Sequence, residues 1–166
     1  MTERVLCQSL RIVRSAILLS LLGIGCRSQV VSLDLKKLHL HQNDISLPEQ
    51  ISLVPVGSVG SLPKSVRSRI PKMSNPGGRF AATDVVILPS TPTRRLVFGG
   101  ISDRYCLVHY EYGGIGHGYM TALFALSDNQ SIPLWAHAGG RYDSLDQFAK
   151  EADRRELTNE VNDAIF

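Results

Sequence analysis

Cysteine is scarce in this sequence, and its uncharged N-terminal run is short. The 166 residues include three cysteines, at positions 7, 26 and 106. The uncharged run near the N terminus covers only residues 15–25, whereas a stable transmembrane helix needs about 20 apolar residues. A permanent membrane span at this end of the chain is therefore the weaker interpretation.

A strong charge of either sign is also lacking. The chain has 18 lysines and arginines against 15 acidic residues, and three of the bases and one of the acids fall within residues 1–26. The remainder is therefore close to neutral, and its charge gives no indication of nucleic acid binding. The Gly-x-Ser-x-Gly motif of serine hydrolases does not occur, and no other catalytic motif stands out.

Residues 1–26 have the organisation of an export signal. Arg4, Arg11 and Arg14 precede the uncharged run, which ends in small residues before Cys26. This order is typical of secretory signal peptides, because the translocon accepts a short apolar helix and keeps its positive end inside. The alternative is a buried amphipathic helix, but such a helix would not place all its charge before its apolar residues.

The end of this segment resembles the lipobox of bacterial lipoproteins. Ile24 and Gly25 suit the two positions before Cys26, while Gly23 stands where a leucine-like residue is usual and Leu22 lies one place too early. The resemblance implies that Cys26 is lipidated after cleavage and anchors the protein to the membrane on the periplasmic side of the bacterial cell envelope. The departure at Gly23 leaves ordinary cleavage and secretion as the alternative.

Export has a consequence for the remaining thiol. If Cys26 is lipidated and Cys7 leaves with the signal, Cys106 is the single thiol of the folded domain and has no partner for an internal disulfide. Cys106 stands within an apolar run, so we predict a small buried hydrophobic residue and not a nucleophile.

Composition divides the chain. We predict three segments: a signal peptide at 1–26, a tether or irregular segment at 27–62, and a single domain at 63–166. The tether is inferred from residues 55–63, which are rich in glycine, serine and proline, although residues 30–35 alternate apolar and polar side chains and residues 47–54 could be a short strand. Residues 80–137 resemble a domain of exported bacterial proteins without an assigned role.

The domain is predicted to be α+β, an antiparallel meander of four or five strands at about 84–137 with a C-terminal helix packed on one face. The strands are expected at residues 84–88, 94–98, 104–112, 119–126 and 132–137. Connections this short join antiparallel neighbours, since a parallel crossover needs a dozen or more residues. A short helix after Pro63 and a turn at 73–78 are expected before the sheet.

The C-terminal helix is predicted from its cap and its apolar stripe. Ser144 and Gln147 have the spacing of a capping box, in which each side chain bonds to the backbone near the other. The apolar stripe consists of Leu145, Phe148, Ala149 and Ala152. A second stripe, which begins at Leu157, is out of phase with the first and predicts a kink or a second short helix.

Four polar residues near one end of the sheet are candidate metal ligands. Strand alternation over residues 104–112 places His109 and Glu111 on one face, and Cys106, Val108, Tyr110 and Tyr112 on the other, which we take as the core side. Imidazole and carboxylate suit Zn²⁺, so the candidates are His109, Glu111, His117 and His137. The alternative is the polar outer face of a half-exposed sheet, with His109 and Glu111 solvated or paired. This alternative is favoured because the spacing matches no established motif.

The glycines at 113, 114, 116 and 118 predict a long hairpin turn or bulge. A phosphate-binding loop would lead into a helix, but the segment that follows has a strand pattern, so nucleotide binding is not favoured. The loop is flanked by Tyr110, Tyr112 and Tyr119, whose rings could form a binding surface for a protein or a glycan. Arg94 and Arg95 are expected to be an ordinary solvated pair at a strand start.

These features favour an exported envelope protein, held at the membrane by a lipid on Cys26, that serves as a non-enzymatic binding module for a protein or cell-wall component. We expect no cofactor and no nucleic acid partner. One alternative is a small metal-dependent enzyme that uses His109, Glu111 and His117. The other is a periplasmic inhibitor or immunity protein, which rests on analogy with small exported domains.

Overall fold

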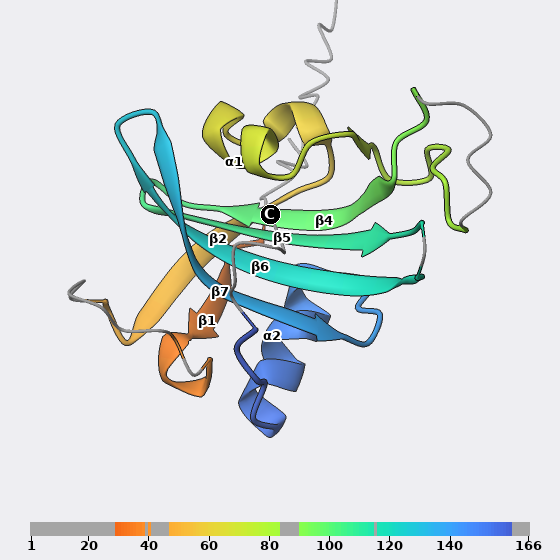
Figure 1. Ribbon diagram of the computed structural model, residues 1–166. Helices are drawn as coiled ribbons and strands as arrows, with labels where there is room; N and C mark the ends of the chain where they lie inside the picture. The colour runs from red at the N-terminus through yellow and green to blue at the C-terminus, as the bar shows by residue number, and fades with distance from the viewer. Residues whose placement is uncertain (1–28, 39, 41–46, 84–89, 115, 161–166) are drawn as a thin grey trace, which may run out of the picture.

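A seven-stranded sheet lies at the centre of the computed structural model (Figure 1), which describes residues 29–38, 40, 47–83, 90–114 and 116–160. The strands are β1 (Val31–Asp34), β2 (Gln50–Val56), β3 (Met73–Ser74), β4 (Arg94–Ile101), β5 (Tyr105–Tyr112), β6 (Gly118–Ser127) and β7 (Gln130–Gly139). Their order across the sheet is β1-β2-β4-β5-β6-β7, and β3 pairs with β4. The α+β class is therefore confirmed.

Strands β4 to β7 form the antiparallel meander that the short connections predicted. Hydrogen bonds join each strand to the next in the chain. The β6–β7 turn contains Asn129 at a φ of 65°, which asparagine tolerates better than most side chains. The β4–β5 ladder has a register shift between Leu96 and Phe98, a bulge that alters the side-chain alternation of β4.

The prediction of four or five strands was too low. Strands β1 and β2 fall in the segment expected to be a tether or irregular, and β2 pairs with β4 although far from it in sequence. Their alternating apolar residues explain this: Leu33 and Leu53 are almost fully buried in the core. The predicted strand at residues 84–88 lies outside the described residues, as does the export signal.

Each face of the sheet is covered (Figure 1). On one face, helix α2 (Leu145–Arg154) packs with β1 over a core that contains Leu107, Leu123 and Trp135. On the other, helix α1 (Lys64–Arg69) and the preceding 3-10 turn η2 (Val59–Ser61) bring apolar side chains against Val108 and Phe124. The expectation of a half-exposed sheet is therefore wrong, because covering segments come from both ends of the chain.

Cys106 is confirmed as a buried hydrophobic residue. Its side chain is fully enclosed in the core beneath α1. Burial raises the pKa of its thiol to about 12, because a thiolate would lose its hydration there. Cys106 therefore lacks the thiolate character that a nucleophile requires.

Helix α2 has the predicted cap and the predicted stripe. The Ser144 hydroxyl accepts from the Gln147 backbone N–H at 3.1 Å, and the Gln147 side chain reaches back to the N–H of Asp143 at 2.6 Å. The buried residues of α2 are Leu145, Phe148, Ala149 and Ala152. The helix ends at Arg154, and the chain continues without helix to residue 160. The predicted second stripe falls mainly on residues 161–166, outside the described residues.

The short elements before β4 also form as expected, with additions. Helix α1 begins directly after Pro63 and buries Val66. The turn at residues 75–78 has Gly77 at a φ of 72° and is closed by the Gly78 N–H on the Asn75 carbonyl. Two additions are strand β3 and the 3-10 turn η1 (Leu35–Lys37). Within the described residues, neither α-helix is long and apolar enough to cross a membrane.

Candidate functional site

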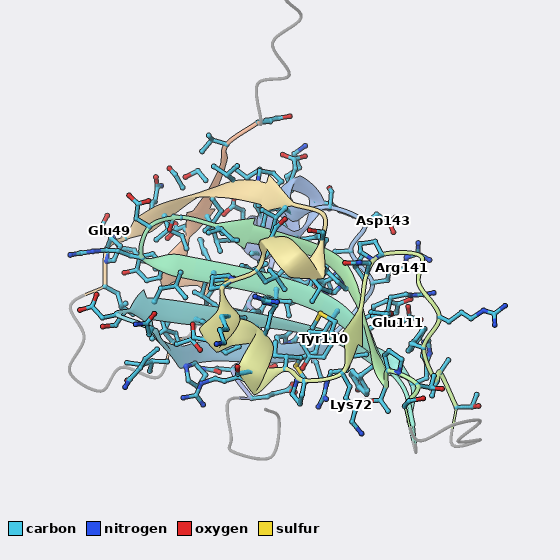
Figure 2. The ribbon with its side chains drawn as sticks, turned by 90° about the horizontal axis from the view of Figure 1, so that it is seen from above. Glu49, Lys72, Tyr110, Glu111, Arg141 and Asp143 are labelled. Carbon is cyan, nitrogen blue, oxygen red and sulfur yellow. The ribbon has the colours of Figure 1, made fainter. Side chains whose placement is uncertain are left out.

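A surface hollow of about 250 Å³ lies at the end of the sheet where β5 stops and β6 starts. We call it the arginine hollow. Its lining is Pro76, Gly77, Arg95, Leu96, Val97, Glu111, Tyr119 and Arg141. Figure 2 shows Glu111 and Arg141 toward one end of the molecule and Glu49 at the opposite end. A second hollow, which contains Arg79 and Phe80, adjoins it through Gly77 and Arg95.

Strand register brings the polar lining together. Arg95 on β4 is the cross-strand partner of Glu111 on β5, and Glu111 is the partner of Tyr119 on β6. Directly opposed residues on neighbouring antiparallel strands point to the same face. One row across three strands therefore presents a guanidinium, a carboxylate and a phenol side by side.

The β4 bulge is what places Arg95 in this row. Nearer the β4–β5 turn, Phe98 pairs with His109, but beyond the bulge Arg95 pairs with Glu111. A regular ladder continued from Phe98 would set Arg95 opposite Tyr112, on the other face of the sheet. The extra residue thus turns Arg95 toward Glu111, since a shift of one residue exchanges the two faces.

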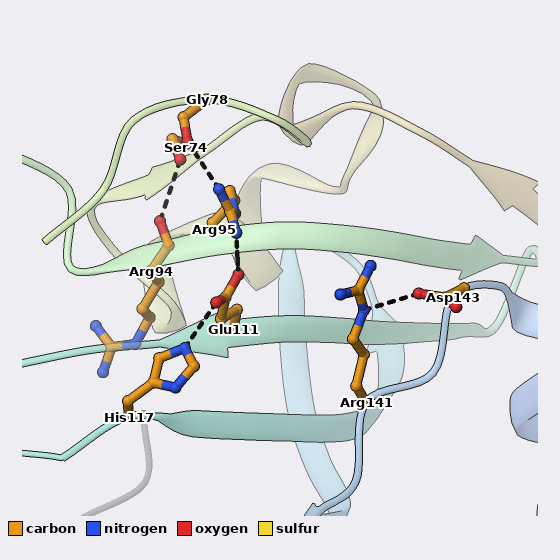
Figure 3. A network of polar contacts seen from close by, with 8 residues as sticks. All are labelled: Ser74, Gly78, Arg94, Arg95, Glu111, His117, Arg141 and Asp143. Carbon is orange, nitrogen blue, oxygen red and sulfur yellow. Dashed lines mark hydrogen bonds and ion pairs between the residues drawn. The ribbon is translucent and has the colours of Figure 1, made fainter. Parts of the chain in front are cut away.

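Arg95 is held on several sides (Figure 3). Its Nε donates to Glu111 Oε2 at 3.0 Å, and its Nη2 makes a second bond to the same oxygen. Its Nη1 reaches the Gly78 carbonyl at 3.5 Å, and the guanidinium lies 4.5 Å from the centre of the Phe80 ring. Such a fork-shaped contact with a ring stacked on it restricts the side chain to one geometry.

Glu111 joins Arg95 to His117 (Figure 3). His117 Nε2 lies 2.7 Å from Glu111 Oε1, and Glu111 is 6% exposed. Burial tends to raise the pKa of the Glu111 carboxyl, but the hydrogen bonds from His117 and Arg95, with their charges, bring it below its ordinary value. Glu111 is therefore ionised at neutral pH, with both oxygens bonded.

Arg141 contributes an exposed guanidinium. Its Nε donates to Asp143 Oδ1 at 2.8 Å (Figure 3). The hydrogen bond and charge of Asp143 raise the pKa of Arg141, and Tyr119 and Glu111 act in the same direction. Among the described residues, the two Nη groups of Arg141 make no hydrogen bond, so their donors are available to a ligand.

The four predicted metal ligands do not surround a common point. Glu111 and His117 are in contact, but His109 is 1% exposed inside the core and His137 Nδ1 donates to the Thr158 carbonyl at 3.2 Å. In the described part of the chain, no group of three or more histidines, cysteines and acids is placed to hold a metal ion. The geometry gives no support to the metal-dependent enzyme.

Both ring nitrogens of His109 are engaged. Its Nε2 accepts from the Tyr142 backbone N–H at 3.3 Å, which leaves Nδ1 to donate to the Thr121 hydroxyl at 2.8 Å. Burial lowers the pKa of His109 to about 4, although the charge of Asp143 opposes the shift. His109 is therefore a neutral core residue with no free nitrogen for a metal.

The predicted tyrosine surface is not formed. Tyr110 is 2% exposed and belongs to the core beneath α1, and Tyr112 packs against the same core. Tyr119 is the cross-strand partner of Glu111, so it points to the opposite face of the sheet. Tyr119 alone of the three lines the arginine hollow.

Sequence reasoning missed the two arginines of the hollow. Arg95 is not a solvated residue beside Arg94 but the partner of buried Glu111. Arg141 follows β7 at the end of the sheet, where a basic residue carries no signal of its own. A search for charges of opposite sign on adjacent strands would find Arg95 only if it allowed for the bulge.

Comparison of the chain with family models, curated proteins and solved structures gives no match. The site is therefore interpreted from its own geometry. That geometry combines a buried, fully bonded carboxylate with an exposed guanidinium, one aromatic ring and apolar surface. It is suited to holding a small polar group in a defined orientation.

Proposed function

We propose that this protein is an exported, lipid-anchored envelope protein that acts as a non-enzymatic binding module for a protein or cell-wall component, with the arginine hollow as its binding site. The export pattern of residues 1–26 and the lipobox-like residues before Cys26 support the location. The arginine hollow supports the binding role.

The observation that carries the proposal is that the side chains of this hollow are preorganised before any ligand binds. Three hydrogen bonds hold these side chains in place: two join Arg95 to Glu111, and one joins Glu111 to His117. A site whose side chains are already fixed loses little conformational entropy when its ligand arrives. The described lining contains no serine, threonine, cysteine or lysine, and both oxygens of its carboxylate, Glu111, are bonded to Arg95 and His117. This lining is more typical of binding than of covalent catalysis.

The position of β1 limits the distance between a lipid on Cys26 and the sheet. Only residues 27–30 separate Cys26 from β1. Four extended residues span at most about 14 Å. A lipid on Cys26 would therefore hold the sheet close to the membrane surface, and the binding partner would be met there.

The experiment is photo-crosslinking in intact cells followed by fractionation. A photoreactive residue replaces Pro76 at the rim of the hollow or, as the matched control, Lys150 on the exposed side of α2. We expect a discrete adduct from position 76 that position 150 does not give, recovered with the membranes. In the Cys26→Ala background, protein and adduct should move to the soluble fraction, and Cys7→Ala should behave as wild type.

Two outcomes contradict the proposal. Equal adducts from positions 76 and 150, or none from either, would show that the arginine hollow is not the binding site. Membrane recovery that is unchanged in Cys26→Ala would refute the lipid anchor.

A further inference from the structure

We infer that the arginine hollow binds the free carboxylate end of a short peptide with a small apolar side chain. This inference rests on the proposed binding function and names the ligand class of the same site. It is drawn from the free donors, the charge balance and the apolar wall of the hollow.

The free donors belong to Arg141. Its Nε is bonded to Asp143, whereas its Nη groups have no partner among the described residues. Arg95 does not offer a comparable pair of donors to a ligand, because its N–H groups are directed to Glu111 and to the Gly78 carbonyl. A guanidinium with two adjacent Nη donors matches the two oxygens of a carboxylate.

The charge balance favours a single negative charge. The hollow contains two guanidinium groups and one buried carboxylate, Glu111, and Asp143 stands beside Arg141 outside the lining. A ligand with two negative charges on one group would face both Glu111 and Asp143 at close range. A monoanionic carboxylate satisfies Arg141 with less repulsion.

The lining and volume of the hollow indicate the size and polarity of the ligand group next to the carboxylate. Pro76 and Val97 supply apolar surface on the side of β4 and its preceding turn, and Tyr119 adds a ring with a hydroxyl. Leu96 borders the hollow, but it is 1% exposed and its side chain belongs to the core beneath α1. The volume of about 250 Å³ lies below the roughly 300–1,000 Å³ of sites for drug-sized ligands. Such a space suits a carboxylate with one or two small side chains.

Two sources share this chemistry, a protein C terminus and a cell-wall peptide that ends in a D-amino acid. The probes that separate them are N-acetyl-dialanine in its L,L and D,D forms, each compared with its C-terminal amide. Binding is measured by calorimetry on the full chain, expressed with its own N terminus and purified from the fraction in which it is recovered.

We expect one of the two acids to bind at least about tenfold more tightly than its amide, since a charge-assisted bidentate contact is lost in the amide. The preferred stereoisomer identifies the source. Arg141→Ala should weaken binding of the acid about tenfold or more, and Arg141→Lys should weaken it less, because lysine keeps the charge without the fork. Arg154→Ala on α2 is the matched control and should bind as wild type.

The inference is overturned by equal binding of acid and amide, by wild-type affinity in Arg141→Ala, or by the absence of peptide binding. Inorganic phosphate that binds at this site more tightly than either acid would also overturn it. Because Arg141 is exposed, circular dichroism should show an unchanged fold in its variants. A crosslink from position 76 without a carboxylate preference would refute this inference and leave the proposed function standing.

Discussion

His109 shows how a polar residue is accommodated in the core of this protein. Its ring lies 4.9 Å from that of Phe98, 5.2 Å from that of Tyr142 and 5.8 Å from that of Tyr119, measured between ring centres. The Thr121 hydroxyl and the Tyr142 N–H satisfy its two nitrogens. These contacts stabilise the neutral ring, and no acceptor is left for a second proton.

Stability is therefore expected to fall in mild acid. Because the pKa of His109 is lowered from 6.5 to about 4 in the folded protein, the unfolded chain binds this proton first. The contribution is fully present above about pH 6.5 and is lost progressively as the pH falls toward 4. Between pH 7 and 5 we expect a loss of about 2 kcal/mol in the free energy of unfolding, measured by urea denaturation.

The control is His109→Gln, which keeps a side-chain donor and acceptor but does not titrate. It should be less stable at pH 7 and should show a smaller loss between pH 7 and 5. Carboxylates titrate in both proteins, so the comparison isolates the histidine. A loss as large in His109→Gln as in the wild type would assign the pH dependence to other groups.

At the scale of elements, the glycine-rich connection between β5 and β6 contains residues with different roles. Gly114 takes a φ of 114°, as predicted for a hairpin turn. Gly113 has another function: a Cβ there would lie 2.1 Å from the Ala81 carbonyl oxygen and 2.6 Å from Ala82 Cα. The segment that carries Phe80 therefore crosses directly over Gly113.

Substitution of Gly113 should displace this crossing segment. We expect Gly113→Ala to lower the free energy of unfolding by about 1–3 kcal/mol, because the new methyl group meets backbone and not a movable side chain. Gly116→Ala is the matched control, since a Cβ at Gly116 has no atom within 4 Å. Thermal unfolding of the two variants provides the measurement. Equal melting temperatures would mean that the segment at residues 81–82 yields without cost.

At the scale of the whole molecule, the sheet edge at β7 is covered by the chain that follows α2. The Glu160 N–H donates to the Ala136 carbonyl at 2.7 Å, and the Ala138 N–H donates to the Glu160 carboxylate at 3.2 Å. The Asn159 side chain accepts from the Ala136 N–H at 3.3 Å. This segment occupies backbone groups that would otherwise be open to another strand.

Removal of this cover should promote self-association. In the double variant Asn159→Ala, Glu160→Ala, the N–H groups of Ala136 and Ala138 lose their side-chain acceptors. We expect a concentration-dependent shift from monomer to dimer or larger species, followed by size-exclusion chromatography with light scattering. Asp153→Ala, on the exposed side of α2, should elute as wild type. An unchanged elution of the double variant at all concentrations would show that the edge is protected by other means.

Local patterns predicted much of this architecture. The meander from β4 to β7, the cap and stripe of α2, and the buried state of Cys106 follow from alternation, from helical spacing and from short connections. These features depend on neighbours in sequence, so the sequence alone is sufficient to predict them. The export signal is likewise a pattern of the sequence alone, and it stays a prediction.

Tertiary structure decided which faces are buried and which side chains meet. Strands β1 and β2 complete the sheet and bury Leu33 and Leu53. The sequence did not predict this, because the glycine-, serine- and proline-rich composition after β2 indicated a tether. The candidate site depends on the β4 bulge, since one extra residue exchanges the faces and brings Arg95 to Glu111. Periodicity cannot reveal such a shift, because the bulge is determined by pairing with a partner strand and by packing on both faces.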